Sequence, residues 1–151
     1  MKKVIVFGLG IMLLWSCNNA TEKSTMHQET KSHTEQHHDE NSEVIELNNG
    51  KKWLVNEEMK PFVLKGEELV NEYIQANKTD YKELAVQLID KNSQLIKSCT
   101  MDGKSHDELH KWLHPHLELV KELENEADTT KANEIVSKIQ HSYQEYHQFF
   151  N

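Results

Sequence analysis

The chain has 151 residues, which is enough for one domain of ordinary size. Its formal charge is −8, and all 17 of its basic residues are lysines. Arginine, which forms bidentate contacts with phosphates and guanine, is absent, so we expect no nucleic-acid partner.

The first sixteen residues predict an export signal. Met1, Lys2 and Lys3 form a positively charged start, and an apolar run follows over residues 4–14. This run is too short to cross a bilayer as a stable helix, whereas its length and charged start are typical of a signal peptide. We therefore expect residues 1–16 to be removed during export.

The end of this segment, Leu14-Trp15-Ser16-Cys17, resembles the lipobox of bacterial lipoproteins. The resemblance implies that the Cys17 thiol is acylated and becomes the mature N-terminus, which would anchor the protein to a membrane of the bacterial cell envelope, on its periplasmic or surface side. The alternative is an ordinary secretory signal with Cys17 unmodified. If Cys17 is lipidated, Cys99 has no partner for an intramolecular disulfide.

Residues 17–42 are polar and predict a disordered tether that begins at the lipidated cysteine. Four histidines in it (His27, His33, His37 and His38) would bind a divalent ion only loosely, and a solvated spacer is the simpler interpretation. Residues 43–55 then predict a short β-hairpin, because the apolar stretches 44–47 and 53–55 flank Asn49-Gly50.

From residue 56 to residue 151 the apolar residues repeat at intervals of three and four, which predicts four amphipathic helices. Asn56, Asp80 and Asp128 or Thr129 are candidate N-caps for the first, second and fourth helices. Ser105 and Glu108 predict a capping box at the start of the third. Short links between such helices favour an all-α, up-down-up-down four-helix bundle.

Alternating helix directions would gather several potential ligands at one end of the bundle. This end would contain the start of the first helix, the end of the second, the start of the third and the end of the fourth. Thioether, thiol and imidazole groups suit Cu(I), Zn(II) or haem iron. The candidates are Met59, Cys99, Met101, His106, His110 and His147.

Two short segments, Asn56-Glu57-Glu58-Met59 and Glu145-Tyr146-His147-Gln148-Phe149-Phe150, resemble the two ends of cytochrome b562, a periplasmic four-helix bundle. In that family a methionine on the first helix and a histidine near the end of the fourth bind haem b axially. The resemblance implies that Met59 and His147 would be the haem ligands, and that the protein would take part in electron transfer.

A second candidate site lies at the corner between the second and third helices. His106 and His110 are four residues apart, so both imidazoles project from one side of a helix and could hold one ion with Cys99 and Met101. We expect His114 to point away, toward solvent. Each residue also has a purely structural interpretation, because Cys99 and Met59 can fill a core and His106 can start a helix.

The remaining patterns narrow the function. His116 follows Pro115 in the apolar stripe, and we expect it to be a core histidine that is hydrogen-bonded to Asn92. No phosphate-binding loop, nucleophile elbow or His-Glu-x-x-His motif occurs, so we expect no enzyme activity. Three functions remain open: a haem or electron-transfer protein, a metal-handling protein that binds Cu or Zn, and a lipoprotein adaptor whose bundle binds an envelope protein without a cofactor.

Overall fold

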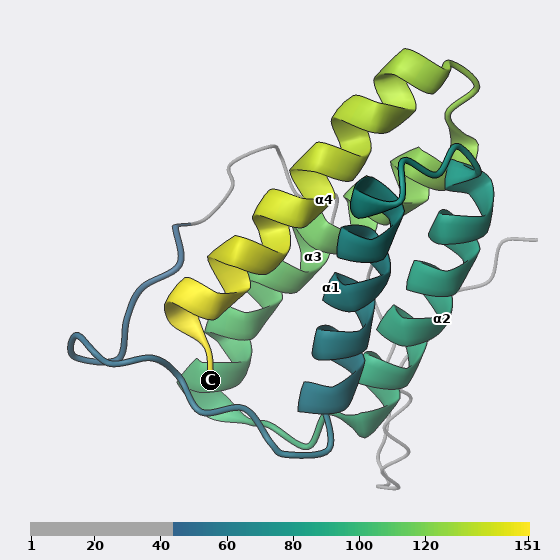
Figure 1. The fold of residues 1–151 in the computed structure, drawn as a ribbon. Coiled ribbons are helices and arrows are strands. Elements are labelled where there is room, and N and C mark those ends of the chain that lie inside the picture. Colours follow the sequence, from purple (N-terminus) through teal and green to yellow (C-terminus); the bar gives the residue numbers. More distant parts are fainter. Residues whose placement is uncertain (1–43) are drawn as a thin grey trace, which may run out of the picture. The chain divides into compact units, whose positions relative to one another are not determined.

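A computed structural model of the chain describes residues 44–151, so the predicted signal peptide, Cys17 and the tether lie outside the described residues. Over the described range the protein is a four-helix bundle without β-strands (Figure 1). The four helices are α1 (Lys60–Gln75), α2 (Tyr81–Ser98), α3 (Gly103–Asn125) and α4 (Thr129–Phe149). Each helix packs against the next, and α1 also packs against α4.

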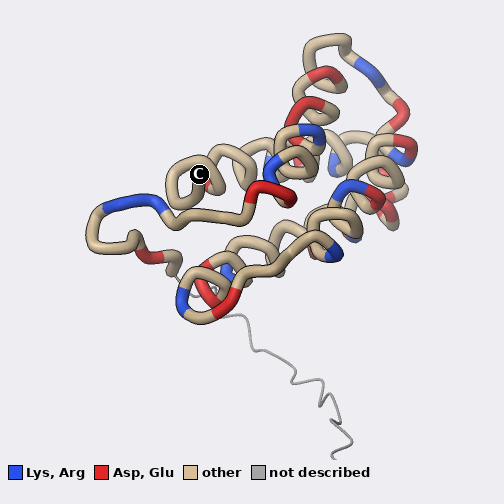
Figure 2. The backbone as a smooth tube through the Cα atoms, turned by 90° about the horizontal axis from the view of Figure 1, so that it is seen from below, with Lys and Arg blue, Asp and Glu red and all other residues tan. Residues whose placement is uncertain are grey.

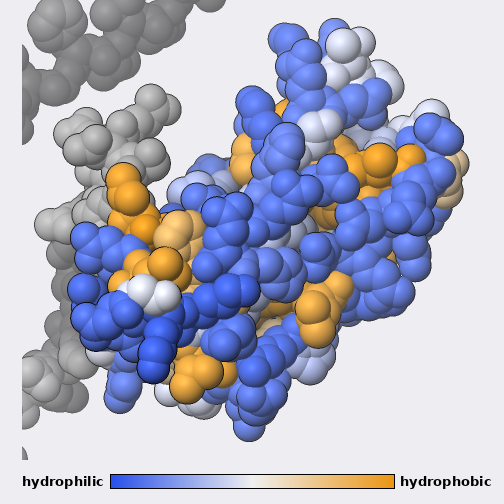
Figure 3. Space-filling view, turned by 60° about the vertical axis from the view of Figure 1, so that its left-hand side comes forward, coloured by the Kyte–Doolittle hydropathy of each residue, from blue (hydrophilic) through white to orange (hydrophobic). Residues whose placement is uncertain are grey.

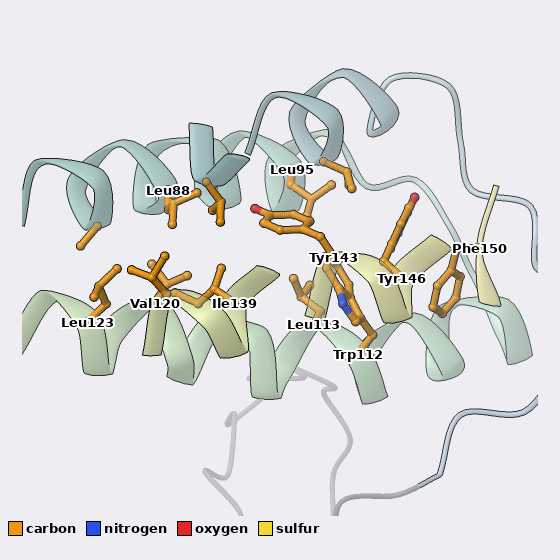
Figure 4. Packing of buried hydrophobic residues seen from close by; sticks show 14 of the residues in the cluster. Leu88, Leu95, Trp112, Leu113, Val120, Leu123, Ile139, Tyr143, Tyr146 and Phe150 are labelled. Carbon is orange, nitrogen blue, oxygen red and sulfur yellow. The ribbon is translucent and has the colours of Figure 1, made fainter. Parts of the chain in front are cut away.

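One apolar stripe on each helix faces the shared core. On α1 the buried residues Val63, Gly66, Val70 and Tyr73 follow the expected spacing of three and four. Figure 4 shows how side chains of α2, α3 and α4, together with Phe150 just after α4, pack against one another. Its labelled members are Leu88, Leu95, Trp112, Leu113, Val120, Leu123, Ile139, Tyr143, Tyr146 and Phe150.

Two of the predicted helix starts are confirmed. The Asp80 carboxylate accepts a hydrogen bond from the Glu83 N–H at 3.0 Å, and the Asp128 carboxylate accepts from the N–H groups of Thr130 and Lys131. These bonds satisfy N–H groups that have no partner within the first turn of a helix.

The other two predicted starts are wrong. Helix α1 begins at Lys60, where Pro61 occupies the first turn, and Met59 rather than Asn56 is its N-cap. Helix α3 begins at Gly103, and Ser105 donates to the Asp102 carbonyl instead of forming a capping box. The Glu108 carboxylate is buried and accepts hydrogen bonds from the Glu46 N–H and from Lys111.

The predicted hairpin forms only its turn. Asn49 and Gly50 both adopt positive φ angles, and Asn48 and Lys51 exchange hydrogen bonds across them. The chain beyond the turn pairs elsewhere: the Trp53 N–H donates to the Phe149 carbonyl at 2.7 Å, and the Asn151 N–H donates to the Trp53 carbonyl at 3.1 Å. Residues 53–55 therefore hold the end of α4 instead of completing a hairpin.

The surface of the bundle is mixed in charge. Figure 2 shows lysines and acidic residues interspersed along the helices. Figure 3 shows apolar patches between the hydrophilic residues on one face. In the described residues, no helix is both long enough and apolar enough to cross a membrane.

Candidate metal-binding pocket

A pocket of about 320 Å³ lies where the start of α1, the end of α2 and the first turns of α3 meet. The structure brings four of the predicted site residues together here, together with one histidine that was expected to face away. The lining residues are Met59, Ile96, Cys99, His106, Leu109, His110, Leu113, His114 and Leu117. We call this site the corner pocket.

Three histidines of α3 form a continuous row along one edge of the corner pocket. His106 Nε2 and His110 Nε2 are 3.0 Å apart, and His110 Nδ1 and His114 Nε2 are 2.9 Å apart. We call these residues the histidine row. His114 is exposed, as expected, but it also lines the corner pocket, because residues at i, i+4 and i+8 advance by only about 40° around a helix at each step.

The two nitrogen–nitrogen contacts of the row share protons through His110. Each nitrogen–nitrogen contact needs one proton, and a neutral ring offers one N–H and one lone pair. His110 can therefore donate to one neighbour and accept from the other. Burial, followed by the charges of His106 and His114, lowers the pKa of His110, which favours the neutral form that binds metal ions.

Two sulfur atoms complete the donors that line the pocket. Cys99 caps the end of α2 in an extended conformation, and its free thiol is half-buried. Met59, at the start of α1, is almost fully buried. Met101 is also half-buried and packs against the core, although it does not line the corner pocket.

Asn56 ties the start of α1 to the end of α2. Its side-chain N–H donates to the Ser98 carbonyl at 2.9 Å, and its carbonyl oxygen accepts from the Thr100 N–H at 3.3 Å. These bonds hold Met59 near Cys99, although the two residues are far apart in the sequence. Sequence reasoning assigned Asn56 to a helix cap and so missed this role.

The ligands are not preassembled around one point. Within residues 44–151, no group of three or more His, Cys, Asp or Glu side chains is arranged to hold a metal ion. The histidine row offers pairs of nitrogens, and Cys99 lies in the same pocket without completing a three-ligand cage. An ion that used Cys99 together with two histidines would require side-chain movement.

The two predicted haem ligands do not meet in this pocket. His147 does not line it, and His147 Nε2 lies 2.8 Å from a carboxylate oxygen of Glu67, eight residues further along α1 than Met59. His147 also contacts the Tyr146 ring edge-on. A haem bound by both residues would require His147 to leave Glu67.

His116 is a core histidine, as predicted, but its partner differs. Its Nδ1 lies 3.0 Å from the Ser142 hydroxyl oxygen of α4, and its ring stacks on Trp112. The expected bond to Asn92 does not form, since Asn92 Nδ2 and His116 Nε2 are both buried without partners. Burial lowers the pKa of His116 to about 4.

A second, more open cavity of about 470 Å³ lies between α3 and α4. None of the predicted ligands lines it. Its polar lining includes His141, an exposed histidine of α4 that can serve as a control residue.

No protein-family model, curated protein or solved structure matches the chain. The resemblances to lipoproteins and to cytochrome b562 therefore stay predictions.

Proposed function

We propose that this protein is an exported, lipid-anchored, up-down-up-down helical bundle that binds a transition-metal ion, Cu(I) or Zn(II), in the corner pocket. The observation that carries the proposal is the convergence of Cys99, Met59 and the histidine row on one pocket. These residues come from three different helix ends, and each would separately have an ordinary structural explanation.

The donor set supports a soft or borderline ion. Thiolate and thioether ligands favour Cu(I), and thiolate with imidazole suits Zn(II). The apolar lining, which includes Leu109 and Leu113, would limit the access of water to a bound ion. Because the cage is not preassembled, we expect binding to draw the Cys99 sulfur toward the histidine pair.

The separation of the two nitrogens is close to the one that a bound ion would need. Two nitrogens bound to a tetrahedral zinc ion lie about 3.3 Å apart, given Zn–N bonds of about 2.0–2.1 Å. His106 Nε2 and His110 Nε2 are 3.0 Å apart. To bind one ion, the proton shared by these two nitrogens would move to the other nitrogen of its ring, and both rings would turn until their lone pairs point at the ion.

The test is a titration with Cu(I), and separately with Zn(II), in competition with a chromophoric chelator. We expect Cys99→Ser and His106→Ala each to weaken binding by about tenfold or more, because each removes one ligand. His141→Ala is the matched control, since it removes an exposed histidine outside the corner pocket. Equal affinity of all four proteins would contradict the proposal.

The same titration with haem tests the cytochrome-like alternative. That function needs Met59 and His147 and is indifferent to Cys99. A Soret band lost only in Met59→Ala and His147→Ala would favour it over metal handling.

The membrane anchor is tested at Cys17, which the lipobox resemblance assigns as the acylated residue. Cys17→Ala should release the protein from the membrane fraction of its host. Unchanged membrane partitioning would contradict lipidation at this residue.

The adaptor alternative has its own observation. Helix α2 exposes the apolar side chains of Val86, Ile89 and Ile96, with Val86 61% exposed. A partner-binding surface would need these side chains to form one contiguous apolar patch along α2. If neither a metal ion nor haem binds above background, this function is favoured.

A further inference from the structure

We propose that residues 44–52 form a detachable strap, which α3 holds against the bundle through Glu108 and Lys111. We call these two residues the latch. The predicted tether joins the bundle through the strap, so release of the strap would move this junction. The inference rests on the proposed function in this last step alone, because the junction matters only if Cys17 anchors the protein.

The latch holds the backbone of the strap with side chains of α3. The Glu108 carboxylate accepts a hydrogen bond from the Glu46 N–H at 2.8 Å, and the Lys111 ammonium donates to the Val44 carbonyl at 3.2 Å. Glu108 and Lys111 also form an ion pair at 2.9 Å. Because Glu108 is almost fully buried, its bonds are shielded from water, and removing its charge should weaken the hold on the strap.

Little else attaches the strap to the helices. Ile45 is its only buried residue, whereas Val44 is 80% exposed and Leu47 is 42% exposed. Among the described residues, the hydrogen bonds of residues 47–52 all lie within the turn. Figures 1 and 2 both show this turn projecting away from the helices. A segment with one buried side chain and few bonds to the core should open at a lower free energy than the core itself.

The strap ends where the chain is held by a different contact. Trp53 is buried, and its backbone pairs with Phe149 and Asn151. This pairing does not involve the latch, so we expect it to persist when the strap opens. Opening breaks the bond from the Trp53 indole N–H to the Glu46 carbonyl at 2.6 Å. It also breaks the exposed ion pair of Lys104 and Glu46, which contributes little to stability.

Opening changes the place where the preceding chain joins the bundle. With the strap closed, the junction lies beside Glu108 and Lys111 of α3. With the strap open, the junction lies at Trp53, beside the end of α4. The released residues 44–52 add up to about 30 Å of reach, since an extended chain spans about 3.3–3.6 Å per residue. The latch would therefore set how far the bundle can lie from the predicted anchor.

The experiment is native-state amide hydrogen exchange of the full chain, followed by NMR at low urea concentrations. We expect the Glu46 N–H to exchange faster than core amides such as that of Leu88. Its exchange rate should also depend little on urea, because opening the strap exposes little surface. If the Glu46 N–H exchanges together with the core amides in one cooperative step, the strap is not detachable and the proposal is overturned.

Substitution of the latch tests its role. Glu108→Gln should speed exchange of the Glu46 N–H by about tenfold or more, because a neutral acceptor binds the strap and Lys111 more weakly. Glu118→Gln is the matched control, since Glu118 pairs with Lys121 at the same i, i+3 spacing on α3 but is exposed. This control should exchange like wild type.

A second variant acts from the strap and leaves α3 unchanged. Ile45→Ala should speed the same exchange by about tenfold, and it keeps the test valid if Glu108→Gln does not fold. In both variants, trypsin cleavage after Lys51 and Lys52 under native conditions should rise in proportion, because cleavage follows the open population. Unchanged exchange and cleavage in both variants would overturn the latch. The anchor is tested separately: if Cys17→Ala stays in the membrane fraction, lipidation at Cys17 fails while the exchange result stands.

Discussion

Helix α3 carries histidines on two faces, and their surroundings differ sharply. On one face, His110 has a histidine on either side and lines a pocket that opens to solvent. On the other face, His116 is fully buried, stacks on Trp112 and lies edge-on to Tyr143 of α4. The two residues are less than two helical turns apart.

The difference shows that the packing around a histidine, rather than its place in the apolar stripe, determines its chemistry. A neighbouring helix covers His116, so its environment opposes a charge and its ring serves as part of the core. No such cover lies over the histidine row, whose nitrogens meet only one another in the described structure. One face therefore contributes mainly to stability, and the other is available for ligands.

The largest effect should come from truncating the buried face. Trp112 is 2% exposed, contacts His116 and Tyr146, and donates its indole N–H to the Ser142 carbonyl at 2.8 Å. We expect Trp112→Ala to lower the free energy of unfolding by about 3–5 kcal/mol, because a large cavity is left. Urea denaturation measures this, and a loss below about 1 kcal/mol would show that the face is not a core.

The next effect is a pH dependence of stability. The pKa of His116 is about 4 in the folded protein and about 6.5 when unperturbed. Between these values the unfolded chain binds a proton that the folded chain does not, so the free energy of unfolding falls as the pH falls from about 6.5 to about 4. The total loss should be about 3 kcal/mol.

This pH dependence is measured by denaturation across that range with a chelator present, so that bound metal does not contribute. His116→Gln is the control, because the amide can still bond to Ser142 and does not titrate in this range. Equal pH profiles for the variant and wild type would show that His116 is not the group responsible.

A smaller effect should come from a substitution on α1 that disturbs the packing around the buried face of α3. A Cβ atom added at Gly66 would meet the hydroxyl oxygen of Tyr143. The ring of Tyr143 packs against His116. We expect Gly66→Ala to destabilise the fold by about 1–3 kcal/mol through overpacking. Zinc affinity should stay unchanged, and a parallel loss of affinity would mean that the two faces of α3 are coupled.

The smallest effect should come from the histidine row. His110→Ala, measured without metal, should change the free energy of unfolding by less than about 1 kcal/mol, since the row is at the surface and its bonds are exchanged for water. Thermal unfolding with a chelator provides the measurement. A loss above about 2 kcal/mol would give the row a structural role.

Local patterns predicted the helices well. Asp80 and Asp128 act on N–H groups two or three residues away, so the sequence alone contains what is needed to place them. Asn56 and Glu108 have the same local signature, but their partners lie on distant segments, at Ser98 and Glu46. Tertiary hydrogen bonds therefore overrode the predicted caps.

The part of the candidate site that depends only on the order and direction of the helices was predictable from the sequence. Alternating helices were expected to gather Met59, Cys99, His106 and His110, and the structure brings them to one pocket. The inclusion of His114 was also available from the sequence, because its spacing of four from His110 keeps both on one side of the helix. The position of His147 beside Glu67 could not be predicted from the sequence, since it depends on how α4 is rotated against α1.

The pairing of residues 53–55 with residues 149–151 has a consequence for folding kinetics. It joins segments about a hundred residues apart, so its loop-closure entropy is large and we expect it to form after the helices have docked. The Trp53 indole, which is buried and bonds to the Glu46 carbonyl, should therefore become shielded from water in the last step. In a variant that lacks the other two tryptophans, its fluorescence would report the closing of the chain separately from the assembly of the helical core.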